Sequence, residues 1–82
     1  MVNITFSPEF ERLFSKIKDG SLKEKVVKQI MKLEKTPESG KPMRYSREGT
    51  RELYVSPYRL SYIFNKDEDS VRLIDLYHKD EQ

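Results

Sequence analysis

The sequence contains no cysteine in its 82 residues. This absence excludes a disulfide framework, cysteine-ligated zinc and a thiol nucleophile. Because a secreted domain of this size usually needs such cross-links, the absence favours a reducing compartment, and we expect a cytoplasmic protein. No apolar run approaches the roughly 18–20 residues that cross a bilayer. The first residues also lack the basic start and apolar stretch of a signal peptide. We therefore expect no contact with a membrane.

Apolar residues and charge of one sign are also scarce. Hydrophobic residues make up 35% of the chain and charged residues 37%, which allows one modest core and predicts a single domain spanning residues 1–82. Five tyrosines and four phenylalanines argue against disorder. The net charge is only +2, so the composition permits RNA binding without demonstrating it. The basic residues of the second half are Lys41, Arg44, Arg47, Arg51, Arg59, Lys66, Arg72 and Lys79.

The N-terminal segment predicts one strand followed by one helix. Residues 2–6 alternate apolar and polar side chains, which is the period of a half-buried strand. Ser7-Pro8 then has the pattern of a helix N-cap followed by a proline in the first helical position. We expect Asp19-Gly20 to end this helix. Its apolar stripe at helical spacing consists of Phe10, Leu13, Phe14 and Ile17.

A second helix is expected to begin at the capping box that Ser21 and Glu24 form. Thr36-Pro37 ends it, because the residue before a proline avoids the helical region. Two helices joined by so few residues should form an antiparallel hairpin. The apolar stripe of the second helix is Leu22, Val26, Ile30 and Leu33, widened by Val27 and Met31.

The second half of the chain changes to the pattern of an antiparallel sheet. After a linker at 37–42, we expect strands at 43–46, 52–55, 58–64 and 71–77. The whole order predicts an α+β fold. It consists of an N-terminal strand, an antiparallel two-helix hairpin, and three to four antiparallel strands in a sheet that the helices cover on one face.

The uncovered face of that sheet is the predicted location of a functional site. Side chains alternate between the two faces of a strand. If Leu53, Val55, Leu60 and Tyr62 pack on the helices, then Glu52, Tyr54 and Arg59 share the open face. An arginine beside a tyrosine on an exposed sheet suits a phosphate and a stacked base. Arg59 paired with Glu52 as an ordinary surface arginine remains the alternative.

Three segments of the sequence occur in a familiar combination. Gly40-Lys41-Pro42 forms a "GKP" loop, a glycine turn follows at Gly49, and residues 53–62 read LYVSPYRLSY. These features, with the helical hairpin before them and the Tyr-His-Lys-Asp ending at 77–80, resemble the RelE/ParE toxin superfamily over nearly the whole chain. The resemblance implies a RelE-like fold and a toxin of a type II toxin-antitoxin system.

The resemblance also implies an activity. RelE-like members enter the ribosomal A site and cut the bound messenger RNA without a metal or other cofactor, as the 2′-hydroxyl attacks the adjacent phosphate. Such chemistry needs a proton acceptor, cations around the phosphate and a proton donor. On this pattern Arg59 holds the phosphate, His78 supplies the proton, Lys79 adds positive charge and Glu52 serves as the base. Tyr54 would stack a base.

Three further arginines complete the predicted RNA-binding set, namely Arg44, Arg47 and Arg51. The sequence also departs from the pattern, because RelE itself carries lysines where this chain has Thr50 and Glu52. That departure leaves two alternatives open. One is a ParE-like toxin that poisons DNA gyrase, and the other is an inactive module that binds an antitoxin and, through it, operator DNA. The partners implied are therefore a RelB-like antitoxin, the ribosomal A site with its messenger RNA and, indirectly through the antitoxin complex, operator DNA.

Overall fold

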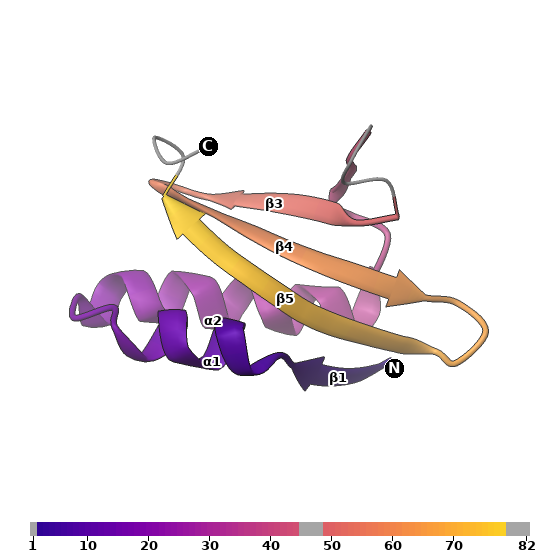
Figure 1. Cartoon of the computed structure of the whole chain (residues 1–82), viewed down its shortest axis with the longest axis horizontal. Helices are drawn as coiled ribbons and strands as arrows, with labels where there is room; N and C mark the ends of the chain where they lie inside the picture. The colour runs from indigo at the N-terminus through magenta and orange to yellow at the C-terminus, as the bar shows by residue number, and fades with distance from the viewer. Residues whose placement is uncertain (1, 45–48, 79–82) are drawn as a thin grey trace.

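The computed structural model describes residues 2–44 and 49–78, arranged as two helices against one five-stranded sheet (Figure 1). The sheet has the order β1-β5-β4-β3-β2. β1 runs parallel to β5, and the other neighbours are antiparallel. The elements are β1 (Asn3–Phe6), α1 (Pro8–Ser15), α2 (Gly20–Lys35), β2 (Lys41–Pro42), β3 (Arg51–Val55), β4 (Tyr58–Asn65) and β5 (Ser70–His78).

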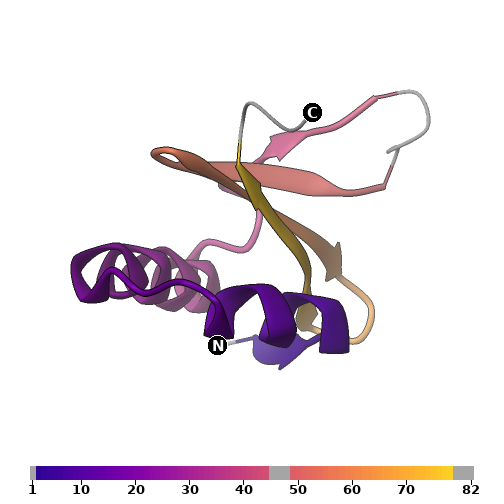
Figure 2. The ribbon, with the colours of Figure 1, turned by 60° about the vertical axis from the view of Figure 1, so that its left-hand side comes forward.

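The α+β fold with helices on one sheet face is confirmed. Figure 2 shows both helices on the same side of the curved sheet, with the other side uncovered by any described helix. The strand expected at 43–46 is wrong in its position. Pairing on that side of the sheet occurs instead at β2, and residues 45–48 lie outside the described part of the chain. Neither described helix is long and apolar enough to cross a membrane.

Local capping decides where the two helices begin. Ser7 caps α1 as predicted, because its Oγ accepts from the Phe10 N–H at 3.0 Å. The predicted capping box of α2 is wrong by two residues. The cap is Asp19, whose carboxylate accepts from the N–H groups of Ser21 (2.9 Å) and Leu22 (3.3 Å). Asp19 therefore starts the second helix, while α1 ends earlier than expected, at Ser15.

The core lies between α2 and the inner face of the sheet. Val26 and Leu33 of α2 are fully buried, as the stripe predicts. The predicted widening of that stripe is wrong, because Val27 and Met31 are 42% and 58% exposed. The sheet and the N-terminal segment contribute Val2, Phe10, Ile17, Val55, Leu60, Tyr62, Val71, Leu73 and Leu76.

A β-bulge in β5 sets which side chains face outward. Ser61 of β4 pairs with Asp75, but its neighbour Tyr62 pairs with Leu73, so Ile74 has no partner on β4. The extra residue shifts the alternation by one. As a result Leu73 and Leu76 both face the core, although they are three positions apart.

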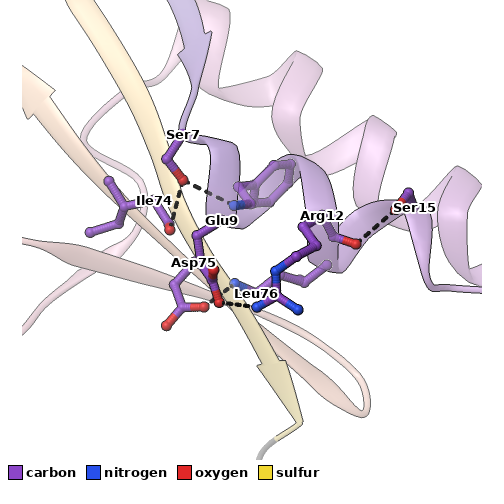
Figure 3. A network of polar contacts seen from close by, with 8 residues as sticks. Ser7, Glu9, Arg12, Ser15, Ile74, Asp75 and Leu76 are labelled. Atoms are coloured by element: carbon purple, nitrogen blue, oxygen red, sulfur yellow. Dashed lines mark hydrogen bonds and ion pairs between the residues drawn. The ribbon is translucent and has the colours of Figure 1, made fainter.

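The bulge is tied to the start of α1 by one hydroxyl group. The Oγ of Ser7 donates to the carbonyl of Ile74 at 2.9 Å while it caps the helix (Figure 3). Ser7 N–H also donates to the Leu73 carbonyl at 2.8 Å. The N-cap residue thus satisfies a carbonyl group that the bulge removes from the regular ladder.

The linker between α2 and β2 is held by two residues of the sheet. The Tyr62 hydroxyl donates to the Pro37 carbonyl and accepts from the Gly40 N–H, both at 2.8 Å. Gly40 is required here, because a Cβ on it would lie 2.5 Å from the Tyr62 oxygen. The guanidinium of Arg51 donates to the carbonyls of Glu38 and Gly40 at 2.9 Å each. Burial raises the pKa of Tyr62 above its usual 10.0.

Replacing Ser7 should destabilise the fold more than replacing another serine of the same helical segment. Ser7→Ala removes a helix cap and a hydrogen bond to the bulge, and we expect a loss of about 1–2 kcal/mol in the free energy of unfolding. Ser15→Ala is the matched control, since the exposed Ser15 hydroxyl bonds only locally, to the Arg12 carbonyl. Urea denaturation of both variants measures the difference. Equal losses would show that the bond to Ile74 is dispensable.

Replacing Tyr62 should destabilise the protein in a pH-dependent way. Tyr62→Phe leaves the buried Gly40 N–H without its acceptor, at a cost of about 1–3 kcal/mol. Because the folded-state pKa is raised, the contribution of Tyr62 is fully present below the unfolded-state pKa near 10.0 and is lost as the pH rises through the folded-state value. The difference in the free energy of unfolding between the parent and Tyr62→Phe should therefore become smaller as the pH rises above about 10.0. A gap that stays constant in denaturation curves at alkaline pH would contradict this.

Candidate functional site

The outward face of the three long strands carries a row of aromatic and basic side chains. Tyr54 of β3 lies directly opposite Arg59 of β4, which in turn lies opposite Tyr77 of β5. Side chains of paired residues project from the same face of a sheet, within about 5.5 Å of one another at Cβ. The predicted gathering of Tyr54 and Arg59 on the open face is therefore present, and Tyr77 joins it.

Glu52 is the buried centre of this group. It lies on the same face but is only 6% exposed. Its Oε1 accepts from Arg59 Nη1 at 3.3 Å, and its Oε2 accepts from the Tyr77 hydroxyl. The bond from Tyr77 crosses β4 to reach β3, above the small side chain of Ser61 that pairs with Glu52. A buried carboxylate is stable only when it is paired and hydrogen-bonded, and both conditions are met here.

Arg59 is the cation of the group, and it is only partly committed to Glu52. Its side chain is 37% exposed, so water screens the arginine side of its ion pair with the buried Glu52. The guanidinium carbon lies 5.6 Å from the centre of the Tyr54 ring, which is within cation–π range. Its Nε is buried and has no hydrogen-bond partner among the described residues. Arg59 therefore retains donor capacity beside an aromatic ring that is 52% exposed.

His78 does not join this group. It is paired with Tyr58, one position from the Arg59–Tyr77 pair, so alternation places it on the helix-facing side. Its ring meets the Tyr58 ring edge-on at 5.6 Å. The two line a small hollow of about 140 Å³ together with Leu13 and Ile17. The expectation that His78 and Arg59 meet on the open face is wrong, because the bulge reverses the parity of the last residues of β5.

The predicted arginines differ in their surroundings. Arg51 pairs with Tyr62 on the inner face and binds linker carbonyls, so the structure gives it a structural role and does not place it on the open face. Arg44 is exposed just after β2, beside a shallow hollow lined by residues 41–44. Lys79 and Arg47 lie outside the described residues.

Sequence reasoning missed three contributors to the open face. Lys41 pairs with Glu52 at the β2 end of the sheet, and Arg72 pairs with Ile63 toward β1. Both are exposed. Among the residues that the structure describes, Lys41, Arg72 and Arg59 are cations of this face, and Glu52 and Asp75 are its carboxylates. Tyr77 is the third contributor, and alternation along β5 would have pointed to it had the bulge been visible in the sequence.

A separate apolar groove lies on the helical side of the molecule. It measures about 300 Å³, and its walls come from β1, α1 and α2. The exposed Val27 and Met31 form its outer border, and Lys23 extends over the Phe14 ring at 5.3 Å. Val27 and Met31 therefore leave apolar surface exposed to solvent along this groove. The lining residues are Phe6, Phe10, Glu11, Phe14, Val27, Ile30 and Met31.

Comparison with protein families gives one match that spans nearly the whole chain. Residues 4–82 match the sequence model of the ParE toxin of the type II toxin-antitoxin system parDE. Among curated protein sequences, none matches this chain significantly.

Solved structures of similar fold come from both bacteria and archaea. One is the RelBE2 toxin-antitoxin complex of Mycobacterium tuberculosis, at 24% identity and a TM-score of 0.85, with 95% of this chain and 98% of that chain covered. A YoeB/ParE toxin from Agrobacterium tumefaciens matches at 14% identity and 0.83, covering 94% and 98%. The archaeal RelE-RelB complex from Pyrococcus horikoshii matches at 11% and 0.80, covering 99% and 98%. At these identities the structures establish the RelE-like fold alone.

Proposed function

We propose that this chain, which belongs to the ParE toxin family within the RelE/ParE superfamily of type II toxin-antitoxin systems, is a cytoplasmic toxin that cleaves messenger RNA in the ribosomal A site. The observation that carries this proposal is the Tyr54–Arg59 pair on an uncovered sheet face. A guanidinium binds a phosphate, and the adjacent exposed ring stacks a base, which is how proteins hold single-stranded RNA.

In this proposal the outward residues divide the chemistry among them. Arg59 holds the scissile phosphate and stabilises its developing charge. Glu52 accepts the proton of the 2′-hydroxyl as that oxygen bonds to phosphorus and the bond from phosphorus to the 5′-oxygen breaks. Tyr77, whose hydroxyl donates to Glu52 in the resting structure, turns that proton to the departing 5′-oxygen, and the proton that Glu52 has taken from the 2′-hydroxyl then passes to the Tyr77 oxygen. The ribosome aligns the strand for in-line attack.

The predicted role of His78 as proton donor is replaced in this scheme. His78 packs against Tyr58 on the other face of the sheet, so it is out of hydrogen-bond reach of a phosphate on Arg59. The proposed role of Lys79 as an additional cation is retained, and it is tested together with Arg59 below.

We propose the apolar groove as the docking site of a RelB-like antitoxin. An amphipathic helix can bury its apolar side on the exposed Val27 and Met31. The exposed side of α2 next to them carries Lys28, Lys32 and Lys35, which favour acidic residues along the polar side of that helix. Through this antitoxin the complex would bind operator DNA.

Gyrase inhibition is the second candidate function. The family description names ParE. The contact between Glu52 and Arg59 on the open face also has the geometry of an ion pair that only stabilises the fold. A toxin of this kind would use the same fold without cutting RNA. A third possibility is an inactive module of the same fold that binds an antitoxin and has no toxic activity.

Growth arrest on induction of the gene without its antitoxin separates the roles of the three basic candidates. Arg59→Ala should abolish growth arrest because it removes the phosphate ligand, whereas His78→Gln should retain it because that ring faces the helices. Lys79→Ala should weaken the arrest partially, through lost charge alone. Antitoxin affinity of Arg59→Ala should stay within about three-fold of the parent, as expected for a site away from the groove. Full toxicity of Arg59→Ala would remove this residue from the mechanism.

Mapping transcript 5′ ends in the same cells identifies the target. Ribonuclease activity predicts new ends inside translated codons that vanish in Arg59→Ala. Gyrase poisoning predicts intact transcripts and gyrase-linked DNA breaks, and that outcome would contradict the ribonuclease proposal.

The groove makes an independent prediction. Met31→Glu places a charge on the apolar border and should weaken antitoxin binding at least ten-fold, since desolvating an unpaired carboxylate is costly. Lys25→Glu is the control, because it makes a larger charge change on α2 without entering the groove. Isothermal titration with the antitoxin measures both, and a comparable loss in the control would show that charge alone is responsible.

A further inference from the structure

Arg59 on the open face is already paired with a carboxylate of the same chain, that of Glu52. Glu52 and the neighbouring Tyr77 form a connected unit, because the Tyr77 hydroxyl donates to one carboxylate oxygen and Arg59 Nη1 donates to the other at 3.3 Å. Glu52 is 6% exposed, so its position is set by the sheet and by these bonds. A guanidinium binds carboxylate and phosphate oxygens with the same geometry. The carboxylate of Glu52 therefore occupies one of the donor positions on the guanidinium that a ligand phosphate would use.

Displacing this carboxylate imposes a cost on every anion. The Arg59 side chain is 37% exposed but that of Glu52 only 5%, so water screens one partner only, and the pair is worth more than the roughly two- to five-fold in affinity of a fully exposed ion pair. The repulsion between Glu52 and an incoming phosphate adds to this cost. A small anion carries no base, so it cannot offset this cost by stacking on the Tyr54 ring.

A nucleotide strand has a second contact available. The Tyr54 ring lies against the Arg59 guanidinium at 5.6 Å and is 52% exposed. Stacking of one base on an aromatic side chain corresponds to about 5- to 150-fold in affinity. That gain offsets the cost of displacing Glu52. The same site thus admits a ligand that offers a base and a phosphate together and rejects one that offers phosphate alone.

We infer that Glu52 and Tyr77 are specificity-determining residues, which restrict the Arg59 site to single-stranded nucleotide ligands by holding a carboxylate against the guanidinium. This inference rests on the proposed function, since it assumes that Arg59 binds the phosphate of an RNA strand. Tyr77 acts through Glu52 and is a positioning residue in this respect. Phosphate that displaces the carboxylate from Arg59 also leaves Glu52 available as the proton acceptor.

Equilibrium binding of two probes to the purified full chain tests the inference. One probe is a seven-nucleotide RNA carrying 2′-O-methyl groups, which cannot be cleaved, and the other is inorganic phosphate. Glu52→Gln keeps the size of the side chain and an acceptor for Tyr77. It should tighten phosphate binding about five- to ten-fold and RNA binding only about three-fold, because inorganic phosphate carries close to two negative charges that Glu52 repels, whereas each phosphodiester of RNA carries one. Cleavage of unmodified RNA should fall. Tyr77→Phe should shift phosphate binding in the same direction by a smaller factor.

The matched control is Asp75→Asn, which removes the same charge from the same face at a residue that pairs with Ser61 and not with Arg59. Asp75 accepts from the Leu76 N–H, and its replacement should change either affinity by less than about two-fold. The effect of Glu52→Gln should also disappear in an Arg59→Ala background, which is the double-mutant test of direct coupling. Circular dichroism confirms that each variant is folded.

The outcomes separate this inference from the function on which it rests. If Arg59→Ala binds RNA as tightly as the parent, the proposed RNA site is wrong. If Arg59→Ala weakens RNA binding but Glu52→Gln leaves phosphate binding unchanged or weaker, the RNA site stands and the specificity role of Glu52 is overturned. The specificity role of Glu52 is also overturned if Glu52→Gln tightens phosphate binding no more than Asp75→Asn does. The same conclusion follows if Glu52→Gln still tightens phosphate binding in the Arg59→Ala background.

Discussion

One extra residue in β5 determines which side chains this protein presents on its uncovered face. A strand alternates with a period of two, so inserting Ile74 between two ladder pairs reverses the face of every residue that follows. Leu76 then faces the core and Tyr77 faces outward beside Arg59. His78 faces the helices. Because the Ser7 hydroxyl bonds the Ile74 carbonyl, the start of α1 and the arrangement of the open face depend on the same contact.

The open face combines two properties that rarely occur together. It contains a carboxylate that is almost fully buried, yet the arginine paired with it remains more than a third exposed. The tyrosine hydroxyl that reaches Glu52 across β4 makes this possible, because it supplies the second hydrogen bond that a buried carboxylate needs. Arg59 is consequently held in place without being enclosed. Such a cation is preorganised for a ligand while a weak internal competitor limits what can bind.

Much of the fold was predictable from the sequence, because it follows from local patterns. Ser7-Pro8 specified the start of α1 through its cap, and the stripe containing Val26 and Leu33 identified the buried side of α2. The start of α2 was misplaced because two capping patterns overlap, and the Asp19 carboxylate satisfies the first N–H groups before Ser21 can.

The site was predictable only where strand alternation is uninterrupted. Glu52, Tyr54 and Arg59 lie on two regular strands, so counting by two placed them together. Counting along β5 failed at His78, since a bulge depends on tertiary contacts such as the one from Ser7. Arg51 alternates onto the inner face of β3 and so does not lie beside Tyr54 or Arg59. The carbonyls that it binds belong to a linker whose path the sequence does not show.

Nuclear magnetic resonance of the full chain during titration with an uncleavable single-stranded RNA tests the central claim most directly. The account predicts that the largest shifts occur at the Arg59 Nε–H and at the rings of Tyr54 and Tyr77, with the His78 ring little affected. Shifts centred on His78, Leu13 and Ile17, with Arg59 unchanged, would contradict it.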